Sequence, residues 1–249
     1  MNLRLRIGQL RSRIEIWLLC SFAGRFLRQF PYRRHWAFDV LRFLSDRQPR
    51  VIFDIGANVG QTTEYLHRFF PHASCYAFEP APTTFRALTA AVGHLKTVSL
   101  HPFAFGEGEG TLPMAVYDYS DMSTLVVPPG LVAAGGVTLE RVAVRTVDSF
   151  CAEQHIERID ILKMDVEAYE SKVLRGCQRM LTEGRIDYIY TEVGFDRNIL
   201  TRSAFTTLHP ILEENGYVLA GFYECWGPDR STLEFCNALY RRASLNSHQ

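Results

Sequence analysis

The sequence predicts a doubly wound α/β fold, in which a mostly parallel seven-stranded sheet carries helices on both faces. Short apolar runs alternate with segments of helical periodicity from residue 51 onwards, and this alternation is typical of parallel sheets. The first apolar run, residues 51–55, leads into a turn with two glycines, and the second, residues 74–79, ends in a carboxylate. Folds of this class hold a nucleoside between such a glycine turn and such an acid.

A basic helical extension is expected over residues 1–48, ahead of the sheet. Apolar residues recur there at helical spacing, and the stripe comprises Leu3, Ile7, Leu10, Ile14, Trp17 and Leu18. The stripe predicts an amphipathic helix over residues 3–22. Residues 1–50 hold 11 Arg against three acids, a net charge of +8, so the rest of this neutral chain carries −8.

This first helix has more than one way to bury its apolar stripe. Arginines beside such a stripe suit a helix lying in an anionic membrane surface, which predicts peripheral membrane contact through residues 1–24. Packing on the rest of the chain, or on a second copy in a homodimer, buries the stripe equally well. A second helix is expected over residues 35–45, ending before Pro49, because proline disfavours the helical conformation at Gln48.

One domain over residues 49–242 follows, with a short tail over residues 243–249. Its expected strands are residues 51–55, 74–79, 97–104, 159–165, 187–192, 217–222 and 234–241. Its later helices are expected at residues 148–155, 168–181 and 203–215. Residues 111–145 are expected to form an irregular β excursion, since Pro128-Pro129-Gly130 and Gly135-Gly136 indicate exposed loop.

The glycine turn indicates which nucleoside is bound. Its spacing is Asp54-x-Gly56-x-Asn58-x-Gly60, and Glu79 ends the next strand, where a carboxylate can accept hydrogen bonds from both ribose hydroxyls. A dinucleotide site prefers three glycines, so that the pyrophosphate approaches the helix N-terminus. Asn58 replaces the second of these, and Asp54 would repel a pyrophosphate but suits an ammonium or sulfonium group. The pattern therefore predicts S-adenosyl-L-methionine as the cofactor rather than NAD.

A second group of charged residues follows the strand at residues 159–165. Lys163, Asp165, Glu167 and Glu170 lie where this strand turns into the next helix. Burying three carboxylates without partners would be costly. We therefore expect them in an open cleft at the carboxyl end of the sheet, where ligands of such folds bind.

With these motifs the chain resembles the FkbM family of S-adenosylmethionine-dependent methyltransferases, across roughly residues 50 to 241. The matching segments are Asp54 to Gly60, Phe78-Glu79-Pro80, Ala104-Phe105-Gly106, Thr146-Val147-Asp148, Lys163 to Glu167, Glu170, Leu174-Arg175-Gly176, Glu192, Gly216-Tyr217 and Asn237 to Tyr240. The resemblance implies a Rossmann-like domain that moves a methyl group from S-adenosyl-L-methionine to a hydroxyl oxygen of a small molecule or glycan. The family usually has Glu-Gly-x-Glu where this chain has Ala168 after Glu167, a departure that can alter the acceptor pocket.

The acids supply the candidates for catalysis, because an alcohol acceptor must lose a proton and a nearby carboxylate can accept it. Asp165 is the first candidate, since it ends its strand beside the expected methyl position, and Glu167 and Glu192 follow. The expected cofactor-binding residues are Asp54, Gly56, Asn58, Gly60, Glu79 and Ala104. The expected acceptor-binding residues are Lys163 beside the acids, Ser123 where the family often has a Ser-Leu pair, and Tyr223 as a stacking surface for a sugar ring.

Composition and spacing argue against several other classes. The acidic remainder of the chain predicts no nucleic-acid partner, which would need a basic face. No metal is expected, because the six cysteines are scattered without zinc spacing and no set of three well-spaced oxygen ligands is present. The expected location is cytoplasmic, with contact at the inner face of the membrane.

Two alternatives to O-methylation stay open at this point. One is N- or carboxyl methylation. The other is a catalytically silent S-adenosylmethionine-binding module that organises a membrane-associated assembly. Cofactor turnover separates the second from an enzyme, because a silent module binds the cofactor without forming S-adenosylhomocysteine.

Overall fold

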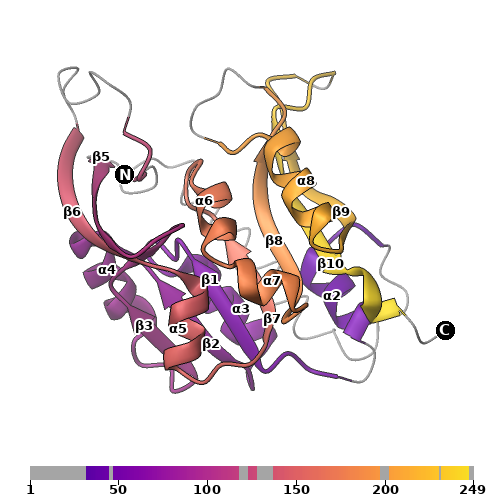
Figure 1. Cartoon of the computed structure of the whole chain (residues 1–249), viewed down its shortest axis with the longest axis horizontal. Coiled ribbons are helices and arrows are strands. Elements are labelled where there is room, and N and C mark those ends of the chain that lie inside the picture. The colour runs from indigo at the N-terminus through magenta and orange to yellow at the C-terminus, as the bar shows by residue number, and fades with distance from the viewer. Residues whose placement is uncertain are drawn as a thin grey trace.

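A twisted seven-stranded sheet runs through the centre of the molecule (Figure 1). In the computed structural model its strands are β1 (Val51–Ile55), β2 (Ser74–Phe78), β3 (Val98–His101), β7 (Ile159–Met164), β8 (Ile186–Gly194), β9 (Tyr217–Trp226) and β10 (Phe235–Arg242). Their order is β3-β2-β1-β7-β8-β10-β9, and every neighbouring pair is parallel except those of β10, which is antiparallel to β8 and β9. The predicted fold class is therefore confirmed.

The structure describes residues 32–44, 47–117, 123–127, 137–196, 202–229 and 231–246. The helix expected over residues 3–22 and the membrane contact expected of residues 1–24 lie outside these ranges. Among the helices within them, none combines the length and the apolar character needed to cross a membrane.

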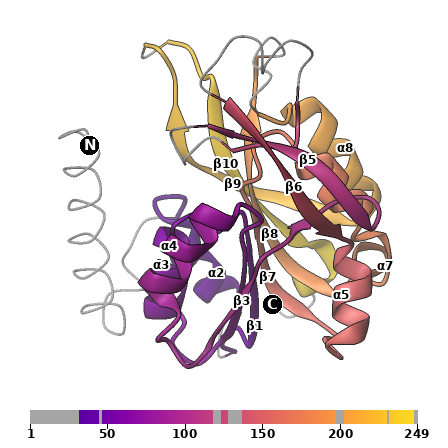
Figure 2. The ribbon, with the colours of Figure 1, turned by 90° about the vertical axis from the view of Figure 1, so that its left-hand side faces the viewer.

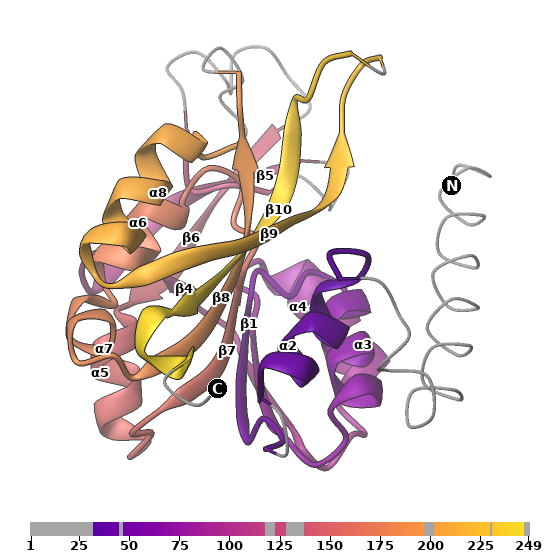
Figure 3. The same ribbon diagram turned by 90° about the vertical axis from the view of Figure 1, so that its right-hand side faces the viewer.

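Helices cover both faces of the large sheet, as Figure 3 shows. One face carries α2 (Trp36–Leu44), α3 (Gln61–Phe69) and α4 (Pro82–Val92), and the other carries α5 (Val147–Glu153), α6 (Glu170–Arg175), α7 (Gln178–Thr182) and α8 (Phe205–Glu214). The single helix expected over residues 168–181 is therefore wrong, since α6 and α7 are separate. Between them, a Cβ on Gly176 would stand 1.9 Å from the carbonyl oxygen of Gly106, so glycine permits a close backbone contact where the helix breaks. A 3₁₀ turn, η3 (Ala243–Asn246), follows β10.

The region expected to be an irregular excursion contributes to a second, small sheet (Figure 2). Its strands β4 (Ala104–Phe105), β5 (Gly110–Tyr117) and β6 (Val137–Arg145) pair in the order β4-β6-β5, and β5 runs antiparallel to β6. The strand expected over residues 97–104 is shorter, because β3 ends at His101 before Pro102, which has no N–H to donate. Ala104 thereby belongs to the small sheet.

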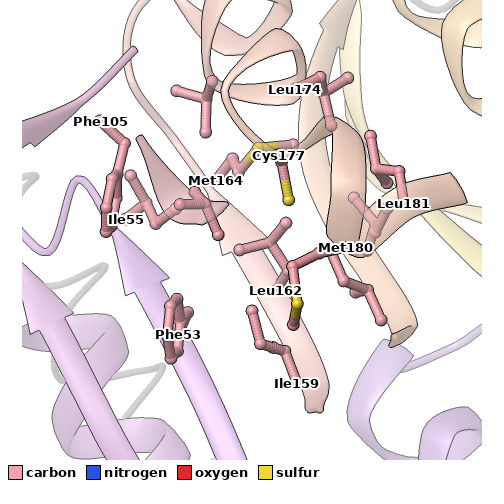
Figure 4. Close-up of a cluster of buried hydrophobic side chains, with 14 of the residues drawn as sticks. Phe53, Ile55, Phe105, Ile159, Leu162, Met164, Leu174, Cys177, Met180 and Leu181 are labelled. Carbon is pink, nitrogen blue, oxygen red and sulfur yellow. The ribbon is translucent and has the colours of Figure 1, made fainter. Parts of the chain in front are cut away.

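Apolar side chains of β1 and β7 form the centre of the core. Phe53 and Ile55 of β1 pack with Leu162 and Met164 of β7, and Figure 4 shows them beneath Leu174 and its neighbours on the covering helices. Every residue of β7 is buried, as expected for a parallel strand with helices on both faces. This packing fixes the carboxyl ends of β1 and β7, where the charged residues follow.

Helix α2 packs on the sheet through a second cluster of buried side chains, so residues before the expected domain boundary at residue 48 contact the domain. Trp36 stacks on Tyr190 of β8 with ring centroids 4.3 Å apart, and the Tyr223 hydroxyl of β9 donates to Asp39 Oδ2 over 2.7 Å. Tyr223 is only 4% exposed. The Tyr223 hydroxyl is therefore used to bind α2, and the stacking role expected of its ring stays a prediction.

Candidate active site

A pocket opens at the carboxyl ends of β1, β2 and β7, between the large sheet and the small one. It encloses about 640 Å³, part of it open to solvent. Its lining residues are Ile55, Gly56, Asn58, Phe78, Glu79, Pro80, Phe103, Ala104, Phe105, Met114, Ser123, Leu125, Asp165, Val166, Glu167 and Tyr169. Residues expected in the cofactor site and residues expected in catalysis therefore share one pocket.

The glycine turn after β1 allows two strands to approach each other at the pocket floor. Gly56 has a φ of 79°, and a Cβ there would stand 1.9 Å from the carbonyl oxygen of Asp165 at the end of β7. A side chain would thus push β1 and β7 apart. Gly60, with a φ of 95°, precedes α3 and faces Leu88 of α4, so it shapes the turn from outside the pocket lining.

Asn58 presents a hydrogen-bonding atom that a ligand can use. Its backbone is left-handed, with a φ of 49°. Its side-chain Oδ1 is buried and accepts no hydrogen bond from any residue that the structure describes. Buried polar atoms are normally paired, so this oxygen suits a donor that enters the pocket.

Glu79, at the end of β2, holds the other side of the same turn. Its Oε2 accepts from the Asn58 N–H over 3.1 Å, and its Oε1 accepts from the Ala81 N–H over 2.9 Å. Burial raises the pKa of the Glu79 carboxyl to about 7, although both backbone donors act in the opposite direction. Each oxygen keeps a lone pair for a further donor, such as a ribose hydroxyl.

Asp54 lies behind the pocket and forms a buried ion pair. Its Oδ1 is 3.0 Å from Lys163 Nζ, and its Oδ2 accepts from the Thr63 hydroxyl over 2.6 Å. Lys163 also donates to the Gly56 carbonyl over 3.2 Å. These two buried side chains neutralise each other beneath the glycine turn, and neither lines the pocket. The expected contacts of Asp54 with the cofactor and of Lys163 with the acceptor stay predictions.

The ammonium of Lys163 remains charged in this setting. Burial acts to lower its pKa, but the carboxylates of Asp54 and Asp165 outweigh burial and raise the pKa above its ordinary value. Asp165 Oδ2 is 3.7 Å from Lys163 Nζ, and half of the Asp165 side chain is exposed to the pocket and solvent. Asp165 thus contacts both the buried pair and the open space where a ligand would lie.

Carboxylates gather on the side of the pocket next to β8. Burial, together with the charges of Asp165 and Glu192, raises the pKa of Glu167 to about 8. Burial and Asp165 likewise raise the pKa of Glu192 to about 7, against the effect of Arg202. Arg202 Nε is 2.8 Å from Glu192 Oε2, so these two residues form an ion pair. Glu192 is not among the residues that line the pocket. Burial, reinforced by the like charges, therefore makes Glu167 a weaker acid than Glu192.

Residues 165–170, the acid turn, hold these carboxylates in an unusual backbone conformation. Glu167 and Ala168 have φ values of 51° and 72°, a region that side chains other than glycine seldom occupy. The buried Glu170 carboxylate accepts from the Val166 N–H over 3.1 Å and from the Ser203 hydroxyl, which fixes the turn from within. Burial raises the pKa of Glu170 despite these donors.

Ala168 occupies the position where the family motif has glycine. Its φ of 72° lies in the left-handed region, which glycine adopts more easily than alanine, and this explains why the motif has glycine there. Ala168→Gly is expected to raise the free energy of unfolding by about 1 kcal/mol, because it removes the steric cost of a Cβ in a left-handed residue. Urea unfolding measures the change. Ala87→Gly on the exposed face of α4 is the matched control, and there glycine should destabilise by about 0.5–1 kcal/mol. Equal destabilisation by both substitutions would contradict the argument.

Several pocket residues escaped the sequence analysis. They are apolar or aromatic, and the principal ones are Phe103, Met114, Leu125, Val166 and Tyr169. Phe103 and Phe78 lie with ring centroids 5.5 Å apart, so they form a continuous wall. Each of them lies close in sequence to a residue that was expected in the site, such as Ala104, Ser123 or the acids. This closeness alone does not identify them, because apolar residues at such positions are equally expected in the core.

The described part of the chain contains no group of three or more His, Cys, Asp or Glu side chains arranged to hold a metal ion. The acids of the pocket are instead associated with Lys163 and Arg202.

Fold, glycine turn and acid cluster together define an S-adenosylmethionine-dependent methyltransferase. Residues 54–219 match the model of the Methyltransferase FkbM domain, and the chain belongs to this family. The expected family resemblance is thus confirmed over most of the domain.

Three relatives illustrate the similarity. Methyltransferase 1 of Beauveria bassiana is 27% identical over 208 residues, which cover 77% of this chain and 80% of the relative. The 31-O-demethyl-FK506 methyltransferase FkbM of Streptomyces tacrolimicus is 30% identical over 154 residues, 51% of this chain and 59% of the relative. The 2-O-methyltransferase NoeI of Sinorhizobium fredii is 28% identical over 163 residues, 60% of this chain and 65% of the relative.

Proposed function

We propose that this protein transfers a methyl group from S-adenosyl-L-methionine to a hydroxyl oxygen of a small molecule or glycan. The observation that carries the proposal is the shared pocket, in which Asn58 and Glu79 face Asp165 and Glu167. A nucleoside site and a set of proton acceptors are what methyl transfer to an alcohol requires. The names of the Streptomyces and Sinorhizobium relatives also place the methyl group on oxygen.

The residues of the pocket fit this cofactor. Glu79 has lone pairs for ribose hydroxyls, the free Oδ1 of Asn58 accepts a further donor, and the wall of Phe78 and Phe103 suits the flat adenine ring. When bound, S-adenosyl-L-methionine supplies a methyl group on a positively charged sulfur. The half-exposed carboxylate of Asp165 favours a positive charge nearby.

Glu167 suits the role of general base better than the other acids. A base is most effective when its pKa lies near the working pH, and Glu167 lines the pocket with a carboxyl whose pKa is raised to about 8 by burial and by neighbouring acids. Asp165 Oδ2 lies 3.7 Å from the ammonium of Lys163, and Glu192 forms an ion pair with Arg202, so both carboxylates already have a cationic partner. We therefore assign proton acceptance to Glu167, ahead of Asp165, which was first in the sequence-based order.

Calorimetry with S-adenosylhomocysteine tests the cofactor assignment. We expect the wild-type protein to bind S-adenosylhomocysteine and not NAD. Glu79→Ala should weaken this binding by about 1.5–3 kcal/mol, the range for hydrogen bonds to a charged group. Glu79→Gln, which keeps an acceptor oxygen, should lose less. Tight NAD binding, or full affinity in a folded Glu79→Ala variant, would contradict the assignment.

A methyl-transfer screen separates the enzyme from the silent module and from the other acceptor classes. Labelled S-adenosyl-L-methionine is incubated with pooled alcohols and glycans, amines and carboxylic acids, and the products are identified by mass. Labelled ethers support the proposed function. Labelled amines or esters indicate the N- or carboxyl methylation alternatives, and cofactor binding without any S-adenosylhomocysteine formation indicates a silent module.

A further inference from the structure

Residues 123–127 form one edge of the pocket and are called the strap below. The backbone of Thr124 pairs with Ala115 of β5 through two hydrogen bonds of 2.8 and 3.0 Å. Ser123 and Leu125, on either side, line the pocket, and Leu125 packs against the cluster that contains Ala81 and Met114. The strap is therefore part of the wall that would enclose the cofactor.

The side chain of Thr124 connects the strap to the acid turn. Its hydroxyl donates to the carbonyl oxygen of Glu167 over 2.6 Å and accepts from the Val126 N–H over 3.0 Å. Thr124 is only 8% exposed, so little solvent is available to replace these bonds. Two segments 43 residues apart in the sequence are thereby joined at the mouth of the pocket.

The hydrogen bond from Thr124 is made to the residue where the acid turn enters its strained, left-handed backbone conformation. Glu167 and Ala168 are both left-handed, and such residues persist only where their surroundings hold them. Glu170 fixes the beginning of the turn through the Val166 N–H, and Thr124 fixes the carbonyl of Glu167 itself. Rotation of this peptide would carry the Glu167 side chain away from the pocket.

We propose that Thr124 is a positioning residue, whose hydroxyl holds the backbone of the acid turn so that Glu167 lines the pocket, and which links that turn to the cofactor wall. The role in the reaction rests on the proposed function, whereas the placement of Glu167 does not. One hydrogen bond of this hydroxyl, to the Glu167 carbonyl, couples the strap to the acid turn, and the other, from the Val126 N–H, fixes the hydroxyl within the strap. The cofactor-side wall and the acceptor-side acid then keep a fixed relation during methyl transfer.

Two substitutions separate the hydroxyl from the methyl group of Thr124. Thr124→Val keeps the shape and removes the hydroxyl, and Thr124→Ser keeps the hydroxyl and removes the methyl. The readout is the titration of the Glu167 carboxyl, followed by ¹³C NMR of the full-length protein and assigned by the signal lost in Glu167→Gln. We expect the Glu167 midpoint to fall by at least one pH unit in Thr124→Val and to stay near the wild-type value in Thr124→Ser. Thermal melting verifies folding, and Thr124→Ala takes the place of Thr124→Val if the latter does not fold.

The kinetics of S-adenosylhomocysteine dissociation give a second readout. The loss of the Thr124 hydroxyl, and with it the bond that ties the strap to the acid turn, should speed dissociation about twofold to tenfold in Thr124→Val, with rescue in Thr124→Ser. An unchanged Glu167 titration in folded Thr124→Val would overturn the inference, and so would an equal shift in Thr124→Ser. Wild-type protein that fails to bind S-adenosylhomocysteine but shows the titration difference would overturn the proposed function and leave the placement of Glu167 supported.

Discussion

Glu167→Gln is expected to slow methyl transfer by about 10²–10⁴-fold, the range for loss of a general base, once an acceptor is in hand. Glutamine fills the same space but cannot accept the proton of an alcohol. Affinity for S-adenosylhomocysteine should change less than tenfold, because the turn formed by Gly56, Asn58 and Glu79 is untouched. Single-turnover kinetics with labelled S-adenosyl-L-methionine separates the two effects.

The pH dependence of the same reaction supplies the control. The pKa of Glu167 is raised to about 8 by burial and by Asp165 and Glu192, so the wild-type rate should rise between about pH 6 and pH 8 as the carboxyl loses its proton. Glu167→Gln should lose that rise. A larger loss of rate in Asp165→Asn, with the rise retained in Glu167→Gln, would move the role of base to Asp165.

Stability should change with pH in the opposite direction. A carboxyl whose pKa is raised on folding stabilises the folded state while it is protonated, and this contribution is lost as the pH rises from the unfolded-state pKa through the folded-state pKa. For Glu167 that window extends from about pH 4.5 to about pH 8. Above it, Glu167→Gln should therefore be at least as stable as the wild type, which distinguishes lost catalysis from lost folding.

Short sequence patterns predicted those parts of the site that are formed by a single continuous segment of the chain. The glycine turn needs only Gly56 and its neighbours, and Glu79 needs only the end of β2, so both could be placed from spacing. The seven strands followed from apolar runs of the right length. The family resemblance added Ala104 and Ser123, which no periodicity would have selected.

Contacts between distant segments were not predictable in the same way. Tyr223 was expected to stack on an acceptor, and its hydrogen bond to Asp39 of α2 joins residues 184 positions apart. Thr124 reaches Glu167 from a segment that pairs with Ala115 of β5, and the sequence does not show this pairing. The split between α6 and α7 depends on the approach of Gly106 to Gly176, which are 70 positions apart in numbering and adjacent in space.

The ion pair beneath the glycine turn illustrates the same limit. The parallel register of β1 and β7 places Asp54 directly opposite Lys163. The sequence shows an acid at the end of one strand and a lysine in another, but not their register. Without the register, Asp54 could be assigned to the cofactor site. The register instead makes Asp54 the partner of the buried Lys163 ammonium.

Asp54→Asn is therefore expected to reduce the free energy of unfolding by about 3–5 kcal/mol, the cost of removing one partner from a buried pair. The asparagine Oδ1 can still accept from Thr63, so the loss comes from leaving Lys163, 7% exposed, without its 3.0 Å counterion. Urea unfolding measures it, and the double variant Asp54→Asn/Lys163→Met should recover part of the loss because no unpaired charge remains in the core. S-adenosylhomocysteine affinity, measured on the fraction that is folded, should fall far less than stability does. Native stability in Asp54→Asn together with lost affinity would contradict this, and would return Asp54 to the role of a cofactor ligand.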